Sequence, residues 1–100
     1  MDIEMIKSPS AGVVKMLQSR TLAKDFLTCD EFDAVGLVQG KLIEMIVATD
    51  LAEKSADVDV VEIKGVCPQH FTMIALLGDT ASVSEALKII SSQFIERGEG

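Results

Sequence analysis

The residues of this sequence that could bind a metal are concentrated in one stretch, KGVCPQH, from Lys64 to His70. Cys67 and His70 form a C-x-x-H pair, which is half of a tetrahedral zinc site that two chains could complete. Thiolates also select iron–sulfur clusters, and a Cys-Pro step such as Cys67-Pro68 occurs in ferredoxin-type cluster sequences. The stretch favours a metal role for Cys67. The alternative is that Cys67 packs as an inert small hydrophobe.

Catalytic patterns are missing from the sequence. It contains no G-x-S-x-G, G-x-x-x-x-G-K or H-E-x-x-H motif. A single histidine cannot supply both a general base and the group that orients it, and the sixteen acidic residues are scattered in the way that a solvated surface requires. The second cysteine, Cys29, lies in an acidic stretch and is interpreted as a structural thiol. We therefore predict that the protein is not an enzyme.

Composition narrows the class further. The chain has 100 residues, enough for one domain, and 48% of them are hydrophobic. A domain this short cannot easily bury so much apolar surface, so part of it is expected to lie between subunits. The net charge of −7 argues against nucleic-acid binding. No signal peptide or membrane-spanning run is visible, so a cytoplasmic protein with reduced thiols is predicted.

The elements that must position the KGVCPQH stretch follow from hydrophobic patterning. Four strands are predicted, over residues 12–19, 33–39, 58–64 and 71–77. Helices are predicted over residues 21–27, over residues 41–56 and from a capping box formed by Ser82 and Glu85 onward. In the long helix, Asp50, Glu53 and Lys54 share one charged face, whereas the rest of its surface is almost wholly apolar. Residues 1–11 are predicted to be a flexible lead-in, residues 12–96 a single domain and residues 97–100 a frayed tail. The fold class is α+β, with helices on one face of an antiparallel four-stranded sheet.

These elements resemble the bacterial microcompartment (BMC) shell domain. The resemblance rests on four segments, DAVGLVQG, KLIEMIVATDLAEKSADVDVVEIKG, FTMIALLGD and ASVSEALKII. The sharpest match is TDLAEKSADV, in which Asp50 is followed four residues later by Lys54 and then by small residues and Val58. A strand-plus-helix unit, GVVKMLQSRTLAKDFL, precedes these segments instead of a strand following them, as in the circularly permuted branch of the family.

The resemblance implies an assembly and several residue roles. Similar domains form cyclic hexamers, flat tiles that pack edge to edge with other shell proteins around enzymes. Lys54, with Asp50, would then lie at the tile edge and contact a neighbouring tile. The other interpretation of this pair is an ordinary i, i+4 ion pair.

The KGVCPQH stretch would line the central pore of such a tile. Six copies of Cys67 would approach one axis, and the most similar branch, the shell proteins of glycyl-radical-type microcompartments, implies an iron–sulfur cluster there. We expect a 4Fe–4S cluster shared between subunits, serving electron transfer or cluster delivery across the shell to glycyl-radical-type enzymes inside; zinc is the lesser alternative. The alternative function is a small oligomeric metal- or ligand-binding domain outside any shell. The residues assigned to the pore loop with Cys67 are Gly65, Val66, Pro68, Gln69 and His70.

Overall fold

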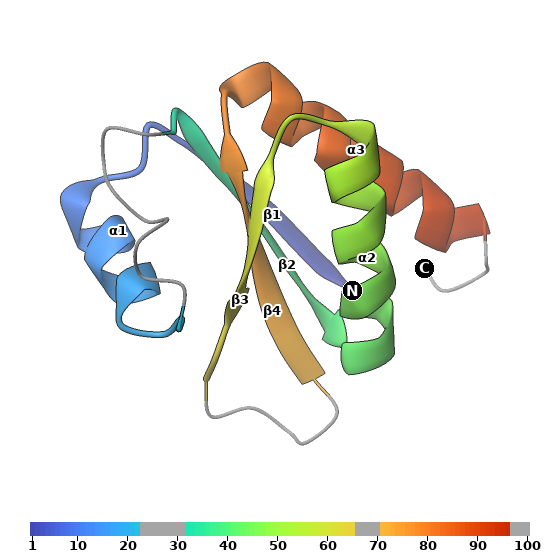
Figure 1. Ribbon diagram of the computed structural model, residues 1–100, viewed down its shortest axis with the longest axis horizontal. Coiled ribbons are helices and arrows are strands. Elements are labelled where there is room, and N and C mark those ends of the chain that lie inside the picture. Colours follow the sequence, from blue (N-terminus) through green and yellow to red (C-terminus); the bar gives the residue numbers. More distant parts are fainter. Residues whose placement is uncertain (23–31, 66–70, 97–100) are drawn as a thin grey trace.

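The structure, a computed structural model, describes residues 1–22, 32–65 and 71–96. Its strands form one antiparallel sheet in the order β1-β2-β4-β3. Helix α1 covers one face of this sheet, whereas α2 and α3 cover the other (Figure 1). In chain order the elements are β1 (Asp2–Lys7), α1 (Ala11–Gln18), β2 (Ala34–Lys41), α2 (Leu42–Ser55), β3 (Asp59–Ile63), β4 (Phe71–Gly78) and α3 (Thr80–Glu96).

The register of the strands defines two ends of the sheet. At one end, Lys41 at the close of β2 is paired with Phe71 at the start of β4. Strand β3 also finishes at this end, with Ile63 paired to Met73. We call it the loop end, because the connection between β3 and β4 leaves and returns there. The opposite end is where β2 begins and β4 finishes at Gly78.

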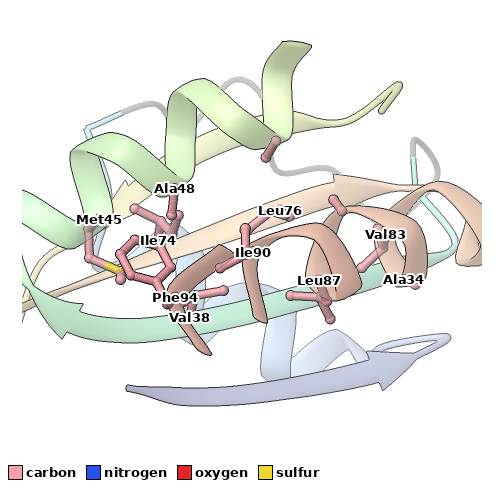
Figure 2. Packing of buried hydrophobic residues seen from close by; sticks show 12 residues of the cluster. Ala34, Val38, Met45, Ala48, Ile74, Leu76, Val83, Leu87, Ile90 and Phe94 are labelled. Carbon is pink, nitrogen blue, oxygen red and sulfur yellow. The ribbon is translucent and has the colours of Figure 1, made fainter. Parts of the chain in front are cut away.

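The larger core lies between the sheet and helices α2 and α3 (Figure 2). Alternate residues of β2 and β4, among them Val38 and Leu76, point to this side and meet Met45 of α2 and Ile90 of α3. The layers approach closely at Gly36, where an added Cβ would lie 3.0 Å from the side chain of Val83. A larger residue at that position would therefore push the side chains of Val83 and Leu87 away from β2 by a few tenths of an ångström.

The smaller core lies under α1, on the opposite face of the sheet. Val14 and Leu17 of α1 are buried there against sheet residues such as Val35 and Leu77. The prediction of helices on one face only is therefore wrong. Strand β4 carries apolar residues at both odd and even positions, and such a strand needs cover on both faces.

The first residues of the chain form β1, which pairs with β2 from Asp2↔Gln39 to Lys7↔Ala34. The prediction of a flexible lead-in is wrong for these residues. DIEMIK alternates polar and apolar residues at its start, so that Ile3 and Met5 pack against the larger core while the charged side chains face outward.

The segment predicted as a first strand, residues 12–19, is instead helix α1. The Ser10 hydroxyl accepts a hydrogen bond from the Val13 backbone N–H at 3.3 Å and caps the helix. Val14 and Leu17 then fall on one helical face, three residues apart. The helix predicted over residues 21–27 lies mostly outside the described residues, and the described Thr21 and Leu22 are not helical.

The long helix is confirmed, with α2 spanning Leu42–Ser55. The start of α3 is one turn earlier than the predicted capping box, because Asp79 rather than Ser82 is the capping residue. The Asp79 carboxylate accepts hydrogen bonds from the backbone N–H of Ser82 at 2.8 Å and from its hydroxyl at 3.0 Å. The backbone bond, followed by the hydroxyl bond, lowers the pKa of Asp79 below its usual value.

Candidate functional site

The predicted pore loop is the connection between β3 and β4. Of its residues the structure describes only Gly65, which is exposed. The predicted ligand Cys67 and the predicted lining residues Val66, Pro68, Gln69 and His70 lie outside the described residues. The described flanks of this connection are held in the sheet, since Ile63 and Phe71 belong to the two adjacent strands β3 and β4.

A cavity adjoins the start of this connection on the α1 side of the sheet. It has a volume of about 360 Å³ and is mostly apolar. Helix α1 is tied to the same place, because the Lys64 backbone N–H donates a 2.6 Å hydrogen bond to the Arg20 carbonyl oxygen. We call this cavity the α1 hollow. Its lining residues are Met16, Leu17, Arg20, Leu37, Ile63, Lys64, Gly65 and Met73.

Polar side chains flank the connection on the other face of the strands. The Thr72 hydroxyl lies 3.3 Å from a carboxylate oxygen of Glu62, whose other oxygen lies 3.6 Å from the Lys64 ammonium group. Both Lys64 and Glu62 are exposed, so the ion pair contributes little to stability.

A second apolar surface lies at the loop end, and none of its residues was predicted from the sequence as part of a site. The first turns of α2 expose Leu42, Ile43 and Ile46, and the exposed fractions of the two isoleucines are 72% and 63%. These three residues, which we call the α2 patch, border a shallow depression with Lys41. The sequence did carry the signal, since this helix is apolar on nearly all sides except its charged face.

The Asp50–Lys54 pair is located near the other end of α2. The Lys54 ammonium group lies 2.9 Å from an Asp50 carboxylate oxygen, and both side chains are largely exposed. The geometry is that of an i, i+4 helix pair, which alone stabilises the helix by only about 0.3–0.5 kcal/mol. The edge contact predicted for Lys54 remains a prediction.

The described part of the chain contains no ready-made metal site. Within residues 1–22, 32–65 and 71–96, no three His, Cys, Asp or Glu side chains come together as metal ligands. Both cysteines and the histidine lie outside these ranges. The described helices also include none that is long and apolar enough to cross a membrane.

Comparison with known proteins identifies the class of this fold. Residues 34–99 match the model of the BMC domain, and the chain therefore belongs to the BMC domain family. It is a structural shell protein of a bacterial microcompartment, located in that shell within the cytoplasm, and proteins of this class assemble with other shell proteins. No match was found among curated proteins.

Within that family the chain is similar to two GrpU microcompartment shell proteins, both solved in ligand-free form. The one from Clostridiales bacterium 1_7_47FAA is 34% identical over 93% of this chain and 94% of its own, with a TM-score of 0.69. The one from Pectobacterium wasabiae is 30% identical over 90% of this chain and 99% of its own, with a TM-score of 0.71.

A third structure shares the fold at lower identity. It is the fused permuted hexameric shell protein MSM0275 from the RMM microcompartment, which is 16% identical over 99% of this chain, with a TM-score of 0.70. This chain covers 46% of that longer one.

The family decides between the two predicted function classes in favour of the shell protein. Shell proteins of this family are structural rather than catalytic, which agrees with the lack of catalytic motifs in the sequence.

Proposed function

We propose that this chain forms a cyclic hexameric shell tile of circularly permuted type, in which the loop from Gly65 to His70 lines the central pore. In this proposal Cys67 from several subunits holds one iron–sulfur cluster. The tile would pass electrons or a cluster across the shell, to glycyl-radical-type enzymes enclosed by it. The observation that carries the proposal is that β3 ends at Ile63 and β4 begins at Phe71, on either side of Cys67 in the sequence, at an end of the sheet that also exposes apolar surface.

Permutation is supported by where the family match begins. The matched region starts at Ala34, with β2, whereas β1 and α1 precede it and complete the sheet and its second face. The fold is also shared with a protein described as permuted and hexameric. A strand and helix placed before the common region, instead of after it, is the arrangement expected of a permuted chain.

Assembly into a ring is supported by the apolar residues left exposed. Leu42, Ile43 and Ile46 cover the outward side of the first turns of α2, and Met16 of α1 is 63% exposed. Exposed apolar residues that lie together, as the three of α2 do, mark an interaction surface, and Met16 marks a second one on the other face of the sheet. Since shell proteins assemble with one another, other copies of this chain are the natural occupants.

The cluster is supported by the chemistry and number of the available donors. One chain provides a single thiolate in the β3–β4 connection, whereas a 4Fe–4S cluster takes four cysteine ligands. A ring supplies the missing ligands from neighbouring copies. The cluster would supply one-electron redox chemistry, and the role of this chain is to bring thiolates to a shared axis. Zinc bound by Cys67 and His70 of two chains is the lesser alternative.

The test is metal analysis of protein purified without oxygen. We expect iron, sulfide and broad visible absorbance in the wild type and their loss in Cys67→Ser. Cys29→Ser is the matched control, because it removes the other thiol of the same chain and should retain both metal and colour.

Each result has a separate meaning for the proposal. Zinc in place of iron would move the site to Cys67 and His70 and exclude the cluster. A metal-free, colourless assembly would leave a shell tile without a metal role for Cys67. Loss of metal in both cysteine variants would contradict the assignment of Cys67 as the only cysteine ligand.

A further inference from the structure

Two apolar surfaces of this chain flank the loop end of the sheet from opposite sides. The α2 patch belongs to the helix that follows β2, and the α1 hollow lies under the helix that covers the other face. In Figure 1, α1 and α2 stand on either side of the sheet, and β3 ends and β4 begins at the same end of it. The chain therefore presents two different apolar surfaces, one on each side of the same end.

The α2 patch is left exposed by the residues that the structure describes. The inner side of α2 already packs on the sheet and α3 through Met45 and Ala48, which are fully buried. Ile43 and Ile46 flank Met45 on other sides of the helix, so they cannot turn inward without removing the buried residues. Within the described part of the chain the patch has no cover, and another molecule can supply it.

The α1 hollow has complementary properties. Its wall is formed by Leu37, Ile63 and Met73 of the sheet and by Met16 and Leu17 of α1. Its volume of about 360 Å³ is large enough to receive several aliphatic side chains, and its rim carries the exposed Arg20. A mostly apolar wall of this kind fits the aliphatic side chains of Leu42, Ile43 and Ile46.

We propose that the α2 patch of one copy packs into the α1 hollow of the next copy around the ring. The contact joins two different surfaces and is therefore heterologous, and repeated heterologous contacts close into a ring when the rotation permits. Because both surfaces flank the loop end, each contact brings the Cys67-bearing connections of neighbouring copies together. The inference rests on the proposed ring and names the surfaces that build it.

A second copy fits better than other occupants. Two patches packed against each other would join only two chains and would leave the hollow empty. A small molecule in the hollow would leave the patch exposed to water. Two interfaces of standard size, each about 800 Å² per partner, would take roughly a quarter of the 6051 Å² surface of the chain, and the two surfaces lie on separate sides where both can be used at once.

The test uses one charged substitution in each surface. Ile43→Asp places a carboxylate in the patch and Met16→Asp places one in the hollow. Both residues are largely exposed, so each chain should keep the wild-type far-ultraviolet circular dichroism. Burying an unpaired carboxylate in an apolar contact should weaken association by at least about 100-fold. Native mass spectrometry is expected to give a ring for the wild type and single chains for both variants.

Mixing the two variants tests whether the two surfaces meet each other. An Ile43→Asp chain retains an intact hollow, and a Met16→Asp chain retains an intact patch. Equal amounts of the two should therefore form a dimer with one chain of each kind, and no larger ring, because the remaining two surfaces are both defective. Leu22→Asp is the matched control, since Leu22 is also an exposed apolar residue but belongs to neither surface; it should keep the wild-type mass.

Three outcomes would overturn the inference. Met16→Asp at the wild-type mass would show that the hollow is not a contact and is free for another occupant. A mixture that stays as single chains would show that patch and hollow do not meet. A monomeric wild type would show that the chain does not form the proposed ring. Cys67→Ser should keep the wild-type mass, so loss of metal with an intact ring would separate the fate of the cluster from that of these contacts.

Discussion

The two ends of the sheet differ in the side chains that they expose to solvent. The loop end exposes the apolar residues of the α2 patch, and the α1 hollow opens beside it. The opposite end is exposed and carries more acidic than basic side chains, with Lys7 of β1 beside four aspartates. Its described aspartates are Asp33, Asp57, Asp59 and Asp79, all placed around the last residues of β4 or the first residues of β2 and β3. In a chain with a net charge of −7, copies can approach each other with least repulsion at the apolar end.

Helix α2 connects the two ends and shows what controls the difference. Its inward side is buried along its whole length, at Met45, Ala48 and Ala52. Its outward side changes from Ile43 and Ile46 in the first turns to charged residues further on. The fold of the single chain requires only the inward side. In the proposed ring the outward side contacts another copy at the loop end, whereas its charged part further on is exposed.

The largest expected effect is on the free energy of unfolding. It should differ between a substitution on the inward side of α2 and one on its outward side at the loop end. Met45→Ala removes a side chain that is 1% exposed and should lower the free energy of unfolding by about 2–5 kcal/mol, because it leaves a cavity in the larger core. Ile46→Ala, at the next residue, should change it by less than about 0.5 kcal/mol. Urea unfolding in an Ile43→Asp background measures both without a contribution from assembly.

Equal losses of unfolding free energy in Met45→Ala and Ile46→Ala would contradict the distinction between the two sides of α2. They would mean that Ile46 is buried by its own chain and that the patch is part of the monomer fold. In the wild-type background the result should differ, since Ile46→Ala should then weaken the assembled species at low protein concentration.

Much of the fold follows from the sequence alone, and the part that does consists of long or continuous apolar segments with clear boundaries. Strands β2, β3 and β4 were predicted within one or two residues, because each is an apolar run bounded by charged residues or glycine. The long helix was also predicted, although it lacks a clear polar face in its first turns. The helix is predicted by the length of the segment and by its many residues of high helix propensity.

The first third of the chain was predicted wrongly for physical reasons. GVVKMLQS carries two adjacent valines, which favour a strand, and only the cap at Ser10 and the burial of Val14 and Leu17 make it a helix. β1 was missed because Ser8 and Pro9 suggest a flexible segment, whereas the strand is stabilised by pairing with β2, a contact distant in sequence. Among the site residues, the sequence could not reveal the α1 hollow, since it forms between α1 and strands that are remote along the chain.

A smaller effect is expected at the charged part of α2. Lys54→Ala removes a pair whose members are exposed, so the free energy of unfolding should fall by no more than about 0.5 kcal/mol. If Lys54 contacts a neighbouring tile, the ring should persist in native mass spectrometry while extended sheets disappear in electron micrographs. Lys88→Ala, an exposed lysine of α3, is the control and should retain both. If sheets persist in Lys54→Ala, Lys54 makes no contact that the sheets need, and its role is limited to the ion pair with Asp50.

The smallest effect belongs to the acidic end, where Asp79 caps α3. Hydrogen bonds from Ser82 hold the pKa of Asp79 below its usual value of 3.8, so the ionised carboxylate stabilises the folded chain above that pH and the stabilisation is lost as the pH falls below it. Asp79→Asn should therefore melt below the wild type at pH 7, with the difference shrinking as the pH falls below 3.8 and the carboxylate becomes protonated. Ser82→Ala keeps the backbone bond and should keep most of this pH dependence, because that bond is the larger cause. Melting curves of wild type and Asp79→Asn that run parallel across the whole range would show that the cap does not depend on charge, and that acid acts on this end only through general repulsion.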